Sequence, residues 1–382
     1  MDKRRDPVST PSAEAIAGAR RIIIKVGSSL LIDDSGKGAR HDWLSGVGEE
    51  LAELRAQGKQ LLIVSSGAVA LGREHLGLRR SARLDFKQAA AAAGQALLMQ
   101  AWERALSPFG IPTAQLLLTL DDTEQRRRSL NARATLEVLL AQGGLPVVNE
   151  NDSVATEELR YGDNDRLSAR VAQLIRGDLL ILLSDVDGLY SADPAAGSGA
   201  RHIPLVDSVT DEIAAYAAGA AGAGIGSGGM RTKIEAARIA SGSGCATIIA
   251  SGRAERPLTR LAEGGIATFV SATGSPGKAY KRWIAGTLAP GGAVSIDEGA
   301  LRALAAGRSL LPGGVTAVEG RFDRGACLRV LDCDGAEVAR GISAYSAAEA
   351  RAIKGRGSAQ IAGLLGYAGP DELIHRDDLV ML

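Results

Sequence analysis

Short apolar runs alternate with helix-like segments from residue 21 to residue 270. The first run, Arg21–Val26, is rich in β-branched residues and is followed at once by Gly27-Ser-Ser29, which is typical of a buried strand that ends in a tight turn. Further strands are predicted at 60–65, 111–118, 145–149, 178–183 and 245–250, and helices at 42–57, 85–106, 130–142, 166–175, 211–221 and 230–241. This alternation predicts an α/β fold built on a largely parallel sheet.

Polar side chains gather where these strands end. Lys25 lies near the end of the first strand and Ser66 follows the second, while Asn149–Asp152 and Ser184–Asp185 follow later ones. In parallel sheets, ligands bind beyond the carboxyl ends of the strands, so these residues are expected to converge on one edge. A lysine within an apolar strand also needs a partner if it is buried. The convergence favours a functional site.

Each of these residues also has a structural explanation. Lys25 could extend its ammonium group from an edge strand into water, and Ser66 could be the N-cap of the next helix. Asp165 precedes the helix predicted at 166–175 and could be another N-cap. For each residue taken singly, the sequence leaves both explanations open.

A glycine-rich stretch provides a second candidate site. Residues 222–233, GAGIGSGGMRTK, lead into the helix predicted at 230–241. Glycines let backbone N–H groups crowd around an anion, so the stretch is either a phosphate-binding loop or a flexible linker. The match Gly224-x-Gly226-x-x-Gly229 lacks the preceding strand of a dinucleotide fingerprint, and no Gly-Lys-Ser/Thr follows as in a Walker A loop.

After Pro290 the pattern changes to short strands with glycine-rich turns. Strands are predicted at 293–296, 314–318, 327–331, 337–343 and 378–381, with short helices near 298–306 and 346–354. This segment is expected to be a small β-rich domain with its own core. Residues 291–382 hold ten Lys and Arg against twelve Asp and Glu, a net charge of −2, whereas nucleic-acid-binding modules usually present a basic face.

The composition argues against several classes of protein. The 44 Lys and Arg balance 44 Asp and Glu, which gives no general argument for binding to nucleic acid or to an anionic membrane. Three cysteines without CxxC spacing and four histidines do not indicate a disulfide framework or a structural zinc site. No apolar run approaches the ~18 residues of a membrane span. Residues 1–20 are predicted to be a disordered extension and not a signal peptide, so we expect a cytoplasmic protein.

Several motifs together resemble the amino acid kinase family over about residues 21–382. They are IIKVGSS at 23–29, VSSGA at 64–68, REHLG at 73–77, VNENDSV at 148–154, GDND at 162–165, GLYSADP at 188–194 and GSGGMRTK at 226–233. The NEND and GDND motifs, combined with a C-terminal β domain, are typical of the branch of the family that phosphorylates glutamate. The C-terminal part resembles a PUA domain.

The resemblance implies a specific architecture. Residues 21–275 are expected to form a three-layer αβα sandwich with a mainly parallel sheet, which is the amino acid kinase fold. A linker at 276–290 and a PUA-like domain at 291–382 follow, and the extension at 1–20 precedes the kinase domain.

The resemblance also implies a reaction, in which ATP phosphorylates the side-chain carboxylate of L-glutamate to L-glutamyl 5-phosphate, the first step of proline biosynthesis. The substrate carboxylate is already a nucleophile, so catalysis depends on alignment and on neutralising charge. The catalytic residues implied are Lys25, Lys233 and Asp165. The glutamate-binding residues implied are Ser66, Asp152 and Asn164, with the carboxylate of Asp152 on the substrate ammonium group.

For ATP, the resemblance implies contacts at the end of the 178–183 strand and in the glycine-rich stretch. The residues are Lys25, Ser184, Asp185, Ser227, Gly228, Gly229, Met230, Arg231, Thr232 and Lys233. Backbone N–H groups around Gly27 and Gly67 are expected to contact the γ-phosphoryl oxygens. Mg²⁺ is expected to accompany ATP, held mainly by phosphate oxygens, with no protein ligand assigned.

Further partners follow from the resemblance alone. It implies a homo-oligomer (a dimer or tetramer), feedback inhibition by proline, and transfer of the labile product to a glutamyl phosphate reductase. No membrane partner is expected. The alternative function is RNA binding through the PUA-like domain, but the neutral-to-acidic balance of 291–382 and the intact kinase motifs favour the kinase.

Overall fold

The computed structural model describes residues 10–33, 38–81, 83–154, 164–194, 199–219, 229–286 and 289–382. The chain divides into two compact units. The first comprises Met1–Glu124 and Asn131–Pro276, and the second comprises Gln125–Leu130 and Gly277–Leu382.

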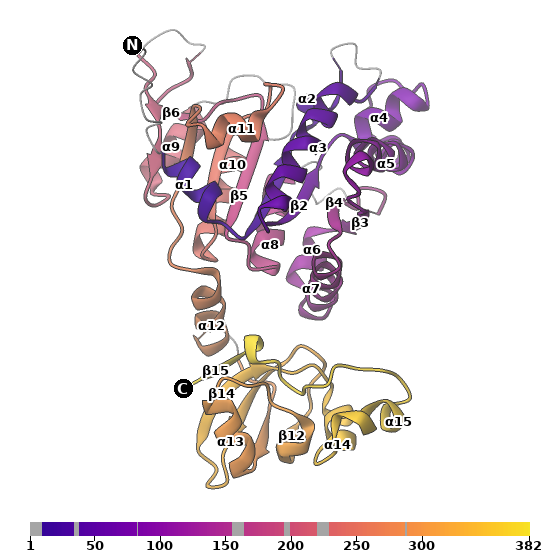
Figure 1. Cartoon of the computed structure of the whole chain (residues 1–382), viewed down its shortest axis with the longest axis vertical. Helices are drawn as coiled ribbons and strands as arrows, with labels where there is room; N and C mark the ends of the chain where they lie inside the picture. The colour runs from indigo at the N-terminus through magenta and orange to yellow at the C-terminus, as the bar shows by residue number, and fades with distance from the viewer. Residues whose placement is uncertain are drawn as a thin grey trace. The chain divides into compact units, whose positions relative to one another are not determined.

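A mainly parallel sheet forms the centre of the first unit (Figure 1). Within the described residues it has eight strands, in the order β3 (Thr113–Leu118), β4 (Leu145–Glu150), β2 (Gln60–Ser65), β1 (Arg21–Val26), β5 (Leu179–Ser184), β9 (Ala246–Ser251), β10 (Ala267–Val270) and β8 (Leu205–Val206). All neighbouring strands are parallel except β9 and β10. The strands β6 (Leu189–Tyr190) and β7 (His202–Ile203) form a separate antiparallel ribbon.

Helices cover both faces of this sheet, because successive side chains of a strand point to opposite sides. On β1, Ile22 and Ile24 belong to one hydrophobic cluster, whereas Ile23 belongs to the other. The first cluster includes side chains of α1 (Pro11–Gly18), α2 (Ser28–Leu31), α3 (His41–Ala56), α4 (Ala68–His75), α5 (Leu84–Leu106) and α11 (Pro257–Ala262). The second includes side chains of α7 (Arg126–Ala141), α8 (Asn164–Leu174), α9 (Asp211–Gly219) and α10 (Met230–Gly242). The predicted three-layer αβα architecture is confirmed.

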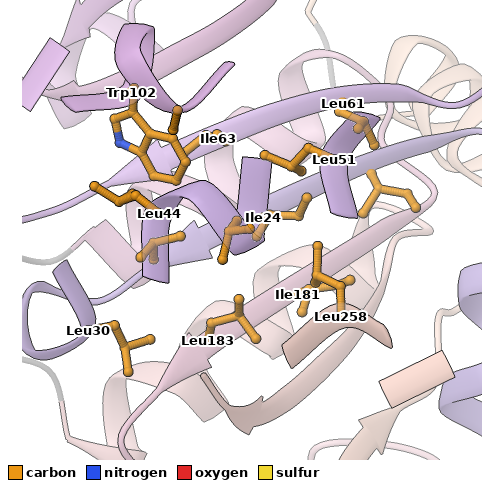
Figure 2. Close-up of a cluster of buried hydrophobic side chains, with 14 of the residues drawn as sticks. Ile24, Leu30, Leu44, Leu51, Leu61, Ile63, Trp102, Ile181, Leu183 and Leu258 are labelled. Carbon is orange, nitrogen blue, oxygen red and sulfur yellow. The ribbon is translucent and has the colours of Figure 1, made fainter. Parts of the chain in front are cut away.

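The first cluster is shown in Figure 2. Ile24, Ile63 and Ile181 of the sheet and Leu44 of α3 belong to this cluster, and all four side chains are fully buried. Burying an aliphatic side chain of this size contributes about 1.5–3 kcal/mol, so this layer contributes strongly to the stability of the unit. It also fixes the central strands whose carboxyl ends form the candidate site.

The helices α4 and α5 pack with their backbones in contact. A Cβ on Gly72 would overlap the carbonyl oxygen of Ala90, and a Cβ on Gly94 would overlap that of Ala68. Only glycine permits this approach at either position. The contact holds α4 in place immediately after Ser66, at the carboxyl end of β2.

The N-terminal segment differs from our expectation, because α1 lies within residues 1–20, which were predicted to be disordered. The Thr10 hydroxyl accepts a hydrogen bond from the backbone of Ala13, and Pro11 occupies the first helical position. Both are favoured at helix starts. Ile16 is buried against the first cluster, which explains why this segment is ordered.

The second unit contains a five-stranded mixed sheet among its described residues. Its order is β12 (Val315–Gly320), β11 (Gly292–Ile296), β13 (Cys327–Leu331), β14 (Glu337–Ile342) and β15 (Leu379–Met381). The predicted helices α13 (Glu298–Ala305) and α14 (Ala347–Ile353) are present, and α15 (Ile361–Leu365) was not predicted. Tyr345 is fully buried in the core of this unit. The β-rich character of the C-terminal part is confirmed.

The segment predicted to be a linker at 276–290 contains another helix, α12 (Pro276–Gly286). Its residue Ile284 is fully buried with Cys327 and Ile342, so packing within the second unit explains the helix. The short helix α6 (Leu120–Glu124) was also not predicted. No helix in the described ranges is both long enough and apolar enough to cross a membrane.

We expect Gly72→Ala to lower the free energy of unfolding by about 1–3 kcal/mol, because the added methyl group forces α4 and α5 apart. Chemical denaturation with urea measures this change. Gly242→Ala is the matched control, since a Cβ at this helical glycine meets no atom within 4 Å. Equal stabilities of the two variants would contradict the close packing of α4 on α5.

Candidate active site

Lys25 points from the centre of the sheet towards α8 and α10. It lies two residues after Ile23 and therefore on the same face of β1, which is the face of the second cluster. Only 6% of Lys25 is exposed. Because β1 lies between β2 and β5, the explanation of Lys25 as an edge residue that reaches water is wrong.

Three charged side chains meet on this face. Nζ of Lys25 lies 2.7 Å from Oδ1 of Asp165, and Nζ of Lys233 lies 3.3 Å from Oδ2. The hydroxyl of Thr232 donates to the same Oδ2 over 2.7 Å. The explanation of Asp165 as an N-cap is wrong, since α8 begins one residue earlier, at Asn164. Two ammonium groups therefore share the carboxylate of Asp165.

The charge of Asp165 is stabilised by its partners. Burial alone would raise the pKa of this carboxyl, but the ammonium groups of Lys25 and Lys233, with the hydroxyl of Thr232, outweigh it and hold the pKa below its ordinary value. A lowered pKa means that the ion pairs stabilise the fold above about pH 4, the ordinary pKa of an aspartate. This stabilisation is lost as the pH falls through the lower pKa of the folded state.

A chain of buried amide groups lies beside this cluster and links α5, β4 and α8. Nδ2 of Asn149 donates to Oε1 of Gln95 over 2.8 Å. Nδ2 of Asn164 donates to Oδ1 of Asn149 over 3.0 Å and to Oγ of Ser66 over 2.9 Å. Ser66 therefore acts as an acceptor for Asn164. It is not the N-cap of α4, which is Gly67.

Two backbone groups fix the direction of this chain. The N–H of Glu150 donates to Oδ1 of Asn149 over 2.9 Å, so the amide nitrogen of Asn149 must face Gln95. The carbonyl oxygen of Ser65 accepts from Nδ2 of Asn164 over 3.4 Å. A backbone N–H only donates and a carbonyl only accepts, so neither amide can turn over without losing a bond. The oxygen of Asn164 is thereby turned away from the chain.

Among the described residues that line one pocket, two buried acceptors have no hydrogen-bond donor. They are Oδ1 of Asn164 and Oδ1 of Asp152, and the pocket has a volume of about 540 Å³. Leaving a buried acceptor unsatisfied costs about 1–3 kcal/mol. A ligand that brings N–H donors, such as an ammonium group, would satisfy both.

In the described part of the chain, no lysine or arginine forms an ion pair with Asp152, unlike Asp165. Burial raises the pKa of Asp152 to about 6. A positive charge that approaches this carboxyl stabilises its ionised form, because the charge replaces the interaction with water that was lost on burial. The predicted glutamate-binding residues Ser66, Asp152 and Asn164 all line the same pocket.

The predicted nucleotide-binding residues fall into two groups. Ser184 and Asp185 lie at the carboxyl end of β5, where Ser184 is buried and Asp185 is exposed. Gly27 lies between this strand end and the lysine, since a Cβ on Gly27 would be 3.9 Å from both Nζ of Lys25 and Cα of Ser184. The strand end and Lys25 are therefore close neighbours.

The second group forms the start of α10. Gly229 is its N-cap and has no side-chain hydrogen bond, and Met230, Arg231, Thr232 and Lys233 follow in the first turns. Met230 and Lys233 are buried, whereas Arg231 is exposed. The remaining predictions, Ser227 and Gly228, lie outside the described residues, as does the rest of the stretch 222–228.

Among the N–H groups expected to contact phosphate around Gly27, that of Gly27 itself is already used, while contacts by its neighbours stay a prediction. The N–H of Gly27 already donates to the carbonyl oxygen of Leu183 over 3.2 Å, as part of the sheet. Gly67 remains a candidate because its N–H has no backbone acceptor in the described part of the chain. It adopts a φ of +105°, which favours glycine at this turn.

Several residues of the site were not assigned from sequence. The sequence places Asn149 only in the polar cluster 149–152, and the predicted site does not include Gln95. The signal for Gln95 was available, since it is a polar residue within the Ala-rich run 89–97 and only 9% of it is exposed. Across the described ranges, no group of three or more His, Cys, Asp or Glu could hold a metal ion.

Comparison with known proteins agrees with this arrangement. The amino acid kinase family matches residues 20–251, and the PUA domain matches residues 292–365. The chain is 58% identical over 377 residues to glutamate 5-kinase of Caulobacter vibrioides, covering 98% of this chain and 100% of that protein. It is 53% identical over 366 residues to glutamate 5-kinase of Paramagnetospirillum magneticum, covering 96% and 99%. For glutamate 5-kinase 1 of Rhizobium meliloti the identity is 51% over 373 residues, covering 97% and 94%.

We expect Asp165→Asn to lower the free energy of unfolding at pH 7 by about 3–5 kcal/mol, because two buried ammonium groups lose their common partner. Lys25→Met should cost clearly less, since Asp165 still pairs with Lys233 and no buried ammonium group loses its carboxylate. Urea denaturation of both variants tests this order. An equal or larger loss in Lys25→Met would show that Asp165 does not balance both lysines.

Proposed function

The chain belongs to the amino acid kinase family, and we infer that it is a glutamate 5-kinase, which transfers the γ-phosphoryl group of ATP to the side-chain carboxylate of L-glutamate. The product is L-glutamyl 5-phosphate, the first intermediate of proline biosynthesis. One structural observation supports the inference for this chain: two buried lysines that share the carboxylate of Asp165 lie at the same strand ends as a pocket with two unsatisfied acceptors. The cluster suits a phosphoryl group, and the acceptors suit the ammonium group of an amino acid.

In the proposed mechanism, an oxygen of the substrate side-chain carboxylate attacks the γ-phosphorus. The bond from the γ-phosphorus to the bridging oxygen breaks, and ADP leaves with the electron pair. No base is needed, because the carboxylate is already ionised at neutral pH. Lys25 and Lys233 offset the negative charge of the transferring group, and Asp165 holds both lysines in position.

The amino-acid end of glutamate is assigned to the pocket. The ammonium group donates to Asp152 and to the oxygen of Asn164, which satisfies both buried acceptors. Ser66 lies at the carboxyl end of β2, accepts a hydrogen bond from Asn164 and lines the pocket assigned to the substrate. The predicted roles of these three residues are compatible with their positions.

ATP is assigned to the ends of β5 and β1 and to the start of α10. Ser184, Asp185 and Gly229–Lys233 lie in these segments, and Ser227 and Gly228 remain predictions from the sequence. Mg²⁺ would be held mainly by phosphate oxygens and would add charge neutralisation there. This fits the residues present, since both oxygens of Asp165 face ammonium groups and are not available to a metal ion.

Phosphoryl transfer, rather than RNA binding, is the primary function, because the kinase family match covers most of the chain and the related proteins are kinases. The PUA domain is a second module of the same chain. Oligomerisation, inhibition by proline, transfer to a reductase and a cytoplasmic location stay predictions.

Trapping of the acyl phosphate tests the function directly. With ATP, Mg²⁺ and hydroxylamine, the protein should convert L-glutamate to its γ-hydroxamate, because hydroxylamine attacks the labile acyl phosphate. Aspartate and N-acetylglutamate serve as comparison substrates. Product from either of these, with none from glutamate, would overturn the assignment.

Lys233→Met should reduce turnover by at least about a thousandfold, because it removes one of the two positive charges that offset the negative charge of the transferring phosphoryl group. The hydroxamate assay measures the rate, and circular dichroism checks that the fold is retained. Arg238→Met, an exposed change on the same helix, is the control and should keep full activity. An active Lys233→Met variant would refute the catalytic role.

The pH dependence should report the carboxyl of Asp152. Its raised pKa of about 6 means that it is protonated below that pH in the free enzyme and cannot attract the substrate ammonium group. At saturating ATP, kcat/KM for glutamate should therefore fall by up to about tenfold per pH unit below pH 6. Glutarate, which lacks the ammonium group, should not show this step, and identical profiles for both substrates would argue against the role of Asp152.

A further inference from the structure

Among the described residues, the pocket that holds Asp152 and Asn164 is lined by more basic than acidic side chains. Asp152 is the one carboxylate in this described lining, and the basic residues come from the segment that contains α4 and the start of α5: Arg73, Arg79, Arg80 and Lys87. Glutamate brings two carboxylates and one ammonium group. The proposed function explains the ammonium group and the reacting carboxylate, but it assigns no partner to the α-carboxylate.

The geometry of α4 directs one of these cations into the pocket. Val69, Ala70 and Arg73 of α4 all line the pocket, and Arg73 follows Val69 by four residues and Ala70 by three, so its side chain lies on the same face of the helix as theirs. Side chains on a helix lean towards its N-terminus, so Arg73 extends back towards Ser66. The close contact between Gly72 and α5 fixes this face of α4.

Arg73 is also the basic residue best suited to a ligand. It is half-buried and makes no hydrogen bond or ion pair through its guanidinium group in the described part of the chain, whereas Arg79 and Arg80 are exposed. Lys87 is half-buried but already takes part in another interaction. A guanidinium group presents two parallel N–H donors, which match the two oxygens of a carboxylate.

We propose that Arg73 binds the α-carboxylate of the amino-acid substrate and thereby selects α-amino acids over simple ω-amino acids. The proposal rests on the proposed function and adds a specificity-determining residue to it. The α-carboxylate and the ammonium group share one carbon atom, so the cation that holds the first must line the same pocket as the acceptors that hold the second. Arg73 meets this requirement together with Asp152 and Asn164.

The test compares two substrates that differ only in this group. L-glutamate and 4-aminobutyrate carry the same reacting carboxylate and an ammonium group, but 4-aminobutyrate lacks the α-carboxylate. In Arg73→Met, kcat/KM for glutamate should fall roughly 10- to 100-fold, the range for a lost hydrogen bond to a charged group. The value for 4-aminobutyrate should change less than about threefold, so that the preference for glutamate collapses. Where turnover of 4-aminobutyrate is too slow, its inhibition constant against glutamate gives the same comparison.

A structural role for Arg73 predicts a different result. Equal losses for both substrates, or an altered KM for ATP, would overturn the proposal, because substrate selection would be unchanged. Arg73→Lys keeps the charge and should recover part of the preference, and it also serves as the test variant if Arg73→Met does not fold. If the preference for glutamate collapses in Arg79→Met but survives in Arg73→Met, the α-carboxylate is bound by Arg79, and the proposal for Arg73 is overturned.

The failure of this inference can be told apart from the failure of the proposed function. Wild-type protein that forms no hydroxamate from glutamate would overturn both. Wild-type protein that is active on glutamate, with a preference that survives Arg73→Met, would overturn the role of Arg73 alone.

Discussion

The shared use of Asp165 by Lys25 and Lys233 is the interaction on which the site depends. It joins the central strand β1 to α8 and α10, which are separated widely along the chain. Burying ammonium groups is costly unless each of them is paired with an anion, and Asp165 provides a carboxylate to both lysines. Burial of aliphatic side chains on both faces of the sheet offsets this desolvation cost. The same side chains fix the strands and helices that carry the charges.

The fold also fixes the orientation of the buried amide groups beside the cluster. Backbone groups of Glu150 and Ser65 determine which way Asn149 and Asn164 turn, so the free oxygen of Asn164 is a property of the fold and not of a mobile side chain. A site built in this way holds its acceptors in place before the ligand arrives. Pre-organised groups of this kind lose little entropy on binding.

Much of the fold could be predicted because its signals are local. The strands β1 and β2 have the predicted bounds, since continuous apolar runs bounded by small residues are distinctive. The helices α1 and α12 differ from the prediction because the local signals for them are weak: residues 1–20 carry charge and proline, and the cap at Thr10 and the apolar residue Ile284 are single-residue signals. In both cases the packing of one isoleucine accounts for the helix, and the position of its partner in space is not visible in the sequence.

The sequence by itself determined the alternation of strands and helices, the family motifs and the set of polar residues at the strand ends, because each depends on residue type and short spacing. Only the tertiary structure decided how those residues are used. It placed Lys25 on a central strand and gave Asp165 two lysine partners, and it used the N–H of Gly27 within the sheet. It also brought Arg73 to the same pocket as Asp152. The physical reason is that burial and hydrogen-bond partners depend on segments far apart in the chain, which meet only when the sheet and its helical layers are assembled.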